Sequence, residues 1–378
     1  MKVFVGMSGG VDSSLSAALL KEQGYDVVGV YMKNWTEDLP GMRCPWADDL
    51  ADAKRVAVQL GIDFRVFDFE KEYKHKVVDY MIEEYKRGRT PNPDIMCNQE
   101  VKFKLFLETA LEQGADVIAT GHYARVSNRF SLSSPSETTS LRDSSLVVSP
   151  QDKSRAADVS LDTTANARLL RAKDDNKDQT YFLYRVSEKA LSKTLFPLGG
   201  YTKDEVREMA KERGLYTASK KESMGICFVG QVGIRDFLGQ YVETKPGDII
   251  DKITGKVLGR HDGAIFYTIG QRHGLELGGG LPYYVTGKDM AKNEVYVSTN
   301  LNDDTMWQGE ILLADPNWIN GTPENGMYRV RIRHRAPLIE CELKDNTLTL
   351  SQPQRAITPG QSAVLYAGDT CLGGGIVV

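Results

Sequence analysis

The N-terminal stretch "KVFVGMSGGVDSSLSAALLKE" constrains the fold more than any other part of the sequence. Its apolar run over residues 2–7 predicts a β-strand, and the helical pattern over residues 12–23 predicts a helix that ends at Gly24. Gly9 and Gly10 lie in the short turn between them. A turn this tight exposes backbone N–H groups at the positive end of a helix dipole, which favours the binding of phosphate.

Strand and helix patterns then alternate along the chain. The alternation predicts an α/β domain with a parallel sheet and helices on both of its faces. Ligands of such sheets bind beyond the carboxyl ends of the strands, where the glycine turn, Met32 and Gly121 fall. We expect further strands over residues 26–32, 63–69 and 115–126, and further helices over 47–61, 71–87 and 98–114.

The pattern changes in the second half of the chain. A helix over residues 202–215 begins at the capping residue Thr202, and short alternating runs between turn residues follow from about residue 222. These runs predict two small antiparallel β domains after the parallel-sheet domain. We expect domains at 1–221, 222–303 and 304–378, with an exposed Ser- and Thr-rich insertion over 127–167 in the first.

Composition narrows the function classes. The formal net charge is −4, so any nucleic-acid contact must rely on a local basic surface. The five cysteines are dispersed without a C-x-x-C pair, and the histidines do not cluster with them, which argues against a disulfide framework and against a zinc or iron–sulfur site. No apolar run is long enough for a membrane span, and the first strand begins directly after Met1, so we expect a cytoplasmic protein without a membrane partner.

The glycine turn lacks the lysine of the Walker pattern and the spacing of the dinucleotide pattern. The sequence "SGGVDSS" directly after a strand instead resembles the pyrophosphate loop of ATP pyrophosphatases. This resemblance implies an adenine nucleotide alpha hydrolase-like domain that splits ATP into AMP and pyrophosphate to activate a carbonyl oxygen. The motif alone does not choose among these enzymes.

Two cysteines lie in stretches that suit reactive thiols. Cys97, in "RTPNPDIMCNQEVKF", is predicted to sit in a rigid loop near a helix start, where a thiol pKa falls, with Asp94 placed to handle a proton. Cys227, in "KKESMGICFVG", follows Lys220 and Lys221 in a glycine-flanked stretch. For each, a small buried core cysteine is the alternative interpretation.

The sequence as a whole resembles the tRNA-specific 2-thiouridylase family. The matching stretches include "GMSGGVDSS", "GRTPNPDIMCN", "ATGHYARV", "NKDQTYFLY", "ESMGICFVG", "YTIGQRHGL" and "CLGGGIVV". They cover nearly the whole chain except residues 127–167. The resemblance implies that Cys227 carries sulfur as a persulfide and that Cys97 is its partner nucleophile, which forms a disulfide with Cys227 as sulfur leaves.

The resemblance also implies the binding residues. The segment of Asn92, Pro93 and Asp94 matches the part that meets the target base. The implied ATP site consists of Gly6, Met7, Ser8, Gly9, Gly10, Val11, Asp12, Ser13, Met32 and Gly121. The implied tRNA contacts are Asn92, Pro93, Asp94, His122, Lys177, Asp178, Gln179, Arg333, His334 and Gln361.

The stretch "YRVRIRHRAP" gives separate support for RNA. If it forms one strand, its period of two places Arg329, Arg331, Arg333 and Arg335 on one face, where they would form a phosphate track. A solvated edge strand is the alternative, since charge also protects edges.

These expectations combine into one reaction. ATP, with Mg²⁺, adenylates the C2 oxygen of the wobble uridine of tRNA, and a cysteine persulfide replaces that oxygen with sulfur. The implied partners are tRNA and a persulfide donor, either a sulfur-relay protein or a cysteine desulfurase, and we expect a monomer. Another pyrophosphate-loop synthetase that acts on a small molecule, or a non-catalytic RNA-binding protein, would leave the two cysteines unexplained.

Overall fold

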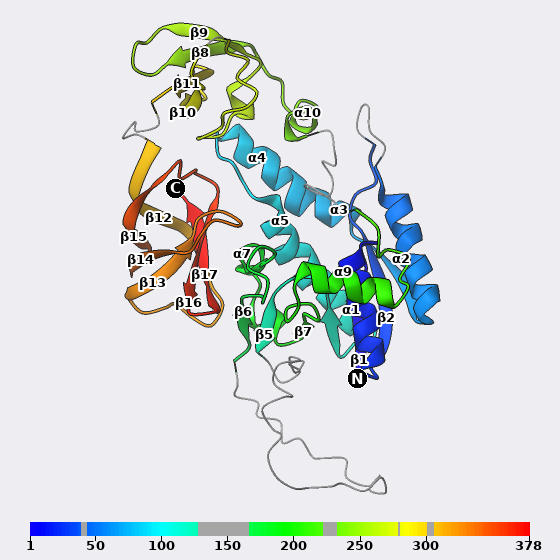
Figure 1. Ribbon diagram of the computed structural model, residues 1–378. Helices are drawn as coiled ribbons and strands as arrows, with labels where there is room; N and C mark the ends of the chain where they lie inside the picture. Colours follow the sequence, from blue (N-terminus) through cyan, green and yellow to red (C-terminus); the bar gives the residue numbers. More distant parts are fainter. Residues whose placement is uncertain (39–43, 128–165, 222–232, 279, 301–305) are drawn as a thin grey trace, which may run out of the picture.

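The computed structural model describes residues 1–38, 44–127, 166–221, 233–278, 280–300 and 306–378. They form three sheets (Figure 1). The first is a five-stranded, wholly parallel sheet in the order β3-β2-β1-β4-β7. Its strands are β1 (Lys2–Gly6), β2 (Asp26–Lys33), β3 (Asp63–Asp68), β4 (Val117–Ala119) and β7 (Thr194–Leu195).

Helices cover both faces of this sheet. Val3 and Val5 of β1 pack in one apolar cluster with Ala17 and Val56, whereas Phe4 packs in another cluster with Phe106. Alternate residues of the strand therefore face opposite helix layers, and the predicted doubly covered parallel sheet is confirmed. The main helices are α1 (Val11–Glu22), α2 (Trp46–Leu60), α4 (Tyr80–Lys86), α6 (Phe106–Glu112) and α9 (Lys203–Glu212).

Two predicted helices contain π-helical turns. The predicted helix over 71–87 is α3 (Glu70–Tyr73), the π-helical η1 (Lys74–Asp79) and α4 in direct succession. The other begins earlier than expected, with α5 (Pro93–Met96), continues through the π-helical η2 (Cys97–Leu105) and ends with α6.

The third sheet is built mostly by the C-terminal part of the chain. Its strand order is β12-β15-β14-β13-β16-β17-β6-β5, and β12 also pairs with β17, which closes a barrel. The barrel strands are β12 (Trp307–Trp318), β13 (Gly326–Arg331), β14 (Ile339–Lys344), β15 (Thr347–Arg355), β16 (Ser362–Ala367) and β17 (Thr370–Val377).

A ribbon from the first domain extends this barrel. The predicted strand over 115–126 is in fact divided: β4 lies in the parallel sheet, and β5 (Arg125–Ser127) pairs with β6 (Arg168–Leu170). Cys371 of β17 pairs with Leu169 of β6, so the two domains share one sheet, and β6 lies beside β17 in Figure 1. Most of the predicted insertion, residues 128–165, lies outside the described residues.

The central sheet has four strands in the order β10-β11-β8-β9. Pairing is antiparallel except between β8 and β11, which is parallel. The run "AIFYTIG" begins with the 3₁₀ turn η4 (Ala264–Phe266) and not with a strand. The elements are α10 (Ile234–Leu238), β8 (Gly247–Asp251), β9 (Val257–His261), β10 (Tyr284–Asp289) and β11 (Glu294–Ser298). Across the described part of the chain, no helix has the length and apolar character needed to cross a bilayer.

Candidate functional site

The glycine turn connects β1 to α1 and packs tightly against α2. Gly9 has φ +73°, and a Cβ there would lie 2.3 Å from the carbonyl oxygen of Asp49. The turn is held internally, because the Ser13 hydroxyl accepts from the Ser8 N–H (3.1 Å) and the Ser14 hydroxyl donates to the Gly10 carbonyl (2.8 Å). The loop therefore has one shape before any ligand arrives, as an anion-binding turn requires.

The loop after β4 closes on the same turn. A Cβ on Gly121 would lie 2.8 Å from the backbone N of Ser13, so only glycine allows this approach. Met32, at the end of β2, touches the position that a Cβ on Gly6 would take (3.0 Å). The carboxyl ends of three neighbouring strands thus meet at one place, as the sequence predicted.

A cavity of about 450 Å³ opens at this edge of the sheet. It continues from the glycine turn to residues of α7 (Thr180–Leu183), of the loop before it and of the turn after β13. Its lining consists of Gly6, Ser8, Gly10, Val11, Asp12, Ser13, Met32, Lys102, Thr120, Gly121, His122, Tyr123, Lys177, Gln179, Phe182, Lys203, Lys221, His334 and Arg335.

Asp12 is held from two directions. The Lys203 ammonium donates to both of its carboxylate oxygens (2.7 and 2.9 Å), and the Tyr123 hydroxyl donates to one of them (2.9 Å). Lys203 is the first residue of α9, whose start is fixed by a capping box between Thr202 and Glu205. A helix far along the sequence thereby delivers a cation to the glycine turn.

The lining is strongly cationic for a chain of negative net charge. Besides Lys203 it includes Lys102, Lys177, Lys221 and Arg335, whereas Asp12 is the one acidic residue among the lining residues that the structure describes. Such a cavity suits a polyanion such as a triphosphate or a nucleic-acid backbone.

His122 is a neutral member of the lining. It is 8% exposed, lies between Phe103 and Phe196, and its Nδ1 lies 2.8 Å from the Thr120 hydroxyl. Burial is the main cause that holds its pKa well below the usual histidine value, with a contribution from Lys102. His122 therefore offers a hydrogen-bonding ring and not a positive charge.

Two aromatic rings from other segments also line the cavity. The rings of Phe182 and His334 lie 4.5 Å apart between centroids at 43°. Phe182 comes from α7, whereas His334 follows β13 of the barrel. Together they form an aromatic surface of the kind on which nucleic-acid bases stack.

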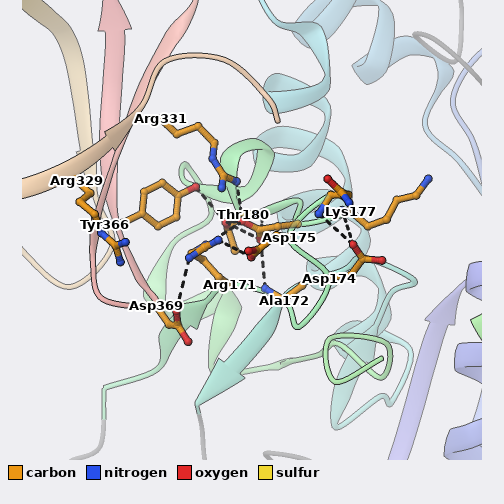
Figure 2. A network of polar contacts seen from close by, with 12 residues as sticks. Arg171, Ala172, Asp174, Asp175, Lys177, Thr180, Arg329, Arg331, Tyr366 and Asp369 are labelled. Atoms are coloured by element: carbon orange, nitrogen blue, oxygen red, sulfur yellow. Dashed lines mark hydrogen bonds and ion pairs between the residues drawn. The ribbon is translucent and has the colours of Figure 1, made fainter. Parts of the chain in front are cut away.

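The predicted track of four arginines is wrong. Strand β13 ends at Arg331, and Arg335 has φ +64°, so the strand period does not continue through this stretch. Arg331 is 4% exposed and its guanidinium donates to Asp178 (2.8 Å). Figure 2 shows Arg331 as part of a network of polar contacts. Of the four, only Arg335 lines the cavity.

Three other residues that were predicted to contact tRNA make contacts within the protein itself. The Gln361 side chain donates to the Thr90 carbonyl (2.8 Å), which ties the barrel to the loop before α5. Arg333 donates to the carbonyl of Ala356 within the barrel. Asp178 as a whole residue is 1% exposed, and its side chain is buried within the protein.

Cys97 and Asp94 lie on the helix that begins at Pro93. Asn92 caps this helix by accepting from the Asp94 N–H (3.2 Å), so the predicted loop position of Cys97 is wrong: Cys97 is inside the helix and 2% exposed. Burial raises the pKa of Asp94, and Lys102 opposes that shift. Lys102 also acts on His122, so this helix connects the Cys97 region to the cavity.

The predicted residues thus fall into three groups. Most of the implied nucleotide residues, with His122, Lys177, Gln179 and His334, share the cavity. Within the described ranges, Met7, Gly9, Asn92, Pro93, Asp94, Cys97, Asp178, Arg333 and Gln361 do not line it. Cys227 lies outside the described residues.

Several lining residues were not among the predictions. Lys203 carried no signal of function, since only the fold brings it to Asp12. Tyr123, which also contacts Asp12, lies in the quoted stretch "ATGHYARV" directly after His122. Phe182 lies in the quoted stretch "NKDQTYFLY", and Lys221 directly precedes the Cys227 stretch, so both had a sequence context. The remaining ones are Lys102 and Thr120, whereas Arg335 was expected only as part of the arginine track.

The fold and the cavity together define a pyrophosphate-loop α/β protein. Family models match nearly the whole chain: "tRNA methyl transferase HUP domain" over residues 1–231, "tRNA methyl transferase PRC-barrel domain" over 235–299 and "Aminomethyltransferase beta-barrel domain" over 308–377. The chain is 43% identical to the tRNA-specific 2-thiouridylase MnmA of Bacillus cytotoxicus, across all of this chain and 94% of that protein. It belongs to the tRNA-specific 2-thiouridylase family.

Further relatives agree. The MnmA of Bacillus anthracis is 42% identical, again across all of this chain and 94% of that protein. Among solved structures, a 4-thiouridine synthetase–RNA complex with bound ATP is 17% identical, covers 64% of this chain and 50% of that chain, and has a TM-score of 0.36, too low to carry an argument. The three matched family segments lie close to the predicted domains, whose boundaries at 221/222 and 303/304 stay predictions.

Proposed function

We propose that the chain is an ATP-dependent tRNA-uridine 2-sulfurtransferase that converts the wobble uridine of tRNA to 2-thiouridine. The observation that carries the proposal is the single cavity that joins the glycine turn to the cationic and aromatic residues of the 177–182 and 334–335 segments. It offers a place for a triphosphate at one end and for an unpaired base with its phosphates at the other. The curated relatives bear the matching name.

In the first step, the turn from Gly6 to Ser13 holds the phosphates of ATP through its backbone N–H groups. The uridine C2 oxygen attacks the α-phosphate, pyrophosphate leaves, and the base is adenylated. Lys203 and Lys221 stabilise the negative charge that builds up on the leaving phosphates. His122, being neutral, hydrogen-bonds the base without repelling these cations.

A magnesium ion fits this site only together with ATP. No cluster of three His, Cys, Asp or Glu side chains that could hold a metal occurs in the part of the chain that the structure describes. Asp12 is the carboxylate in the cavity lining, and Mg²⁺ commonly takes one carboxylate plus phosphate oxygens. When bound, the ion would neutralise phosphate charge.

In the second step, a persulfide on Cys227 supplies sulfur to C2. Either its terminal sulfur attacks C2, and Cys97 then attacks the inner sulfur of Cys227, which breaks the S–S bond and leaves the terminal sulfur on C2. Or Cys97 first attacks the Cys227 sulfur and releases hydrosulfide, which attacks C2. In both routes AMP leaves with the former C2 oxygen, and Cys97 and Cys227 end as a disulfide. A dithiol reductant supplies the two electrons that reset the pair, and a sulfur-relay protein or cysteine desulfurase reloads Cys227.

Cys97 must become accessible for this step, because it is buried in the described structure. Asp94, one helical turn before it and with a raised pKa, is suited to accept and return a proton during the reaction. With tRNA as the substrate, we place the activity in the cytoplasm, and we propose that the monomer is the working unit.

The test is single-turnover thiolation of a transcribed tRNA that carries a wobble uridine, with ATP and a persulfide donor. The 2-thiouridine is scored by mass after nuclease digestion. We expect product with the wild type and loss with Cys97→Ser and with Cys227→Ser. Cys341→Ser is the matched control: this thiol is fully buried in the barrel core, and burial raises its pKa to about 11, so the variant retains activity.

Other outcomes decide between the alternatives. Product from Cys227→Ser with sulfide alone places Cys227 in sulfur delivery and not in base activation. AMP formation with a small acceptor, and without RNA, would instead support a small-molecule synthetase. Because two of the matched family models are described as tRNA methyl transferase domains, a parallel reaction with S-adenosylmethionine is scored for a methylated base, and its appearance would overturn the proposal.

A further inference from the structure

We infer that Arg331 is a positioning residue for tRNA: its buried ion pair with Asp178 fixes the two cavity segments that come from different domains. This inference rests on the proposed function, because it assigns the role to the RNA end of the cavity. The first segment is 177–179 of the α/β domain. The second is 333–335, which begins two residues after Arg331, the last residue of β13.

The pair is almost completely removed from solvent. The Arg331 and Asp178 side chains are 5% and 0% exposed, and Nη1 of Arg331 lies 2.8 Å from Oδ2 of Asp178. Arg171 lies 3.6 Å from the same oxygen. Two guanidinium groups from different domains therefore converge on one carboxylate, and Figure 2 shows Arg171 and Arg331 within the same network of polar contacts.

Further hydrogen bonds hold the Asp178 carboxylate in place. The Thr180 hydroxyl donates to Asp178 (2.9 Å), and the backbone N–H groups of Ala172 and Thr180 do so as well (both 3.3 Å). On the barrel side, the Tyr366 hydroxyl lies 3.1 Å from the Thr180 hydroxyl. Asp178 therefore contacts the loop after β6, α7 and one barrel strand directly, and it reaches a second barrel strand through Thr180.

The neighbours of Asp178 face the opposite way. Lys177 and Gln179 line the cavity, and in Figure 2 the Lys177 side chain extends away from the network. The segment is also tied at Gln179, whose side chain accepts from the Tyr123 N–H (2.8 Å) and whose own N–H donates to the Tyr123 carbonyl (2.9 Å). Moving Asp178 would therefore move both cavity-lining neighbours.

The same holds on the barrel side. The chain turns directly after Arg331, and His334 and Arg335 reach the cavity from that turn. Pinning Arg331 sets the distance between Lys177 and Gln179 on one side and His334 and Arg335 on the other. These residues, together with Phe182, are the RNA end of the cavity.

The energetics favour a positioning role over a stabilising one. A buried ion pair loses much of its attraction to desolvation, and replacing both members with neutral groups is often harmless to stability. Removing one member alone leaves an uncompensated charge and is strongly destabilising. The informative variant therefore removes both charges at once.

The experiment compares the double variant Asp178→Asn/Arg331→Met with wild type in the tRNA thiolation assay. We expect the KM for tRNA to rise roughly ten- to hundredfold, because small displacements of binding groups have effects of that size. The KM for ATP and the melting temperature stay close to wild type. The single variant Arg331→Lys keeps a positive charge beside Asp178, so its KM for tRNA is expected to stay much closer to that of wild type than the KM of the double variant.

The control is Arg329→Met. Arg329 lies two residues earlier on β13, but its guanidinium donates to the Gly368 carbonyl (2.9 Å) and not to Asp178. We expect a wild-type KM for tRNA. A phosphate track along the strand would instead make Arg329 as important as Arg331, so this control separates the two ideas.

A structural readout keeps the inference apart from the proposed reaction. Hydrogen exchange of the amides at 177–180 and 332–336 is expected to quicken in the double variant, with that of α1 unchanged. A double variant that keeps the wild-type KM for tRNA, or that raises the KM for ATP equally, overturns the inference. If the wild type itself neither binds nor thiolates tRNA, the proposed function fails, whatever the exchange data show.

Discussion

The ammonium of Lys203 lies 2.7 and 2.9 Å from the two carboxylate oxygens of Asp12, across a separation of 191 residues in sequence. The Lys203 side chain is 9% exposed, whereas that of Asp12 is 33% exposed, so the pair forms part of the cavity wall and not of the core. A cation held at this place on the rim of the glycine turn is available to a triphosphate, whose charge exceeds that of one carboxylate.

Lys203→Met is therefore expected to reduce kcat/KM for tRNA thiolation by about 100-fold, the loss typical for one charge-stabilising donor. The measurement is pyrophosphate release in single turnovers. Lys173→Met serves as the control, since Lys173 pairs with Glu205 near the start of the same helix and is half exposed. An unchanged rate of pyrophosphate release with Lys203→Met would exclude the role.

Gly9 offers a test of the glycine turn itself. Gly9→Ala would place a Cβ 2.3 Å from the Asp49 carbonyl at φ +73°, so the turn or the first turn of α2 must shift. We expect weaker ATP binding and a loss of stability of about 1–3 kcal/mol. ATP titration and thermal unfolding measure the two effects.

Gly24→Ala is the matched control for that substitution. Gly24 also has a positive φ, +84°, but among the described residues no atom beyond its own chain neighbours lies within 4 Å of the position of its Cβ. The Gly24→Ala variant therefore has an alanine at positive φ, as Gly9→Ala does, but without a steric clash. Equal ATP affinity in the two variants would mean that the close approach of the turn to α2 does not shape the binding site.

Phe182 tests the aromatic end of the cavity. Phe182→Ala removes the ring that lies against His334, and base stacking on an aromatic ring contributes about 1–3 kcal/mol, so tRNA affinity should fall roughly five- to 150-fold. Phe182→Tyr keeps the ring and should bind normally. Filter binding gives both affinities, and an alanine variant with wild-type affinity would contradict the stacking role.

The sequence was sufficient for the first half of the fold because the signals there are local. Apolar periods and glycine stops placed the helices and most strands of the parallel sheet, and the position of Met32 and Gly121 at strand ends followed from the sheet type. The glycine turn was equally readable, since its chemistry depends on a few consecutive residues.

What the sequence did not reveal depends on contacts between distant segments. The alternation of Arg329, Arg331 and Arg333 looks like one strand face, but β13 ends at Arg331, whose side chain is buried against Asp178 from another domain. The position of Lys203 at Asp12 is of the same kind. A local sequence pattern does not indicate an ion-pair partner that lies 153 or 191 residues away in sequence.

The Cys97 helix shows a third limit. Pro91 and Pro93 suggested a loop, but proline is well accommodated in the first turn of a helix, and Asn92 is a good capping residue. The helix therefore begins four residues before Cys97 and not after it. The prediction was wrong because both prolines were interpreted as helix breakers, whereas Pro93 marks the start of the helix.

His334 leads to a prediction on pH. Burial is the main cause that lowers its pKa to about 4, from 6.5 in the unfolded chain; Arg335, Arg331 and Lys177 add to the shift and Asp178 opposes it. Between these two values the unfolded state binds more protons, so stability is complete above about pH 6.5 and declines as the pH falls toward 4. The decline from this one group is at most about 1.4 kcal/mol per pH unit.

His334→Phe removes the proton-binding group and keeps an aromatic ring beside Phe182. Its melting temperature should therefore fall less than that of the wild type over the acid range, while the two proteins match near neutral pH. His75→Gln is the control, because the His75 side chain is 84% exposed at the surface of η1. If the melting temperatures of wild type and His334→Phe fall equally down to pH 4, the folded protein does not keep the His334 imidazole neutral. The aromatic surface of Phe182 and His334 would then carry a charge under acid conditions.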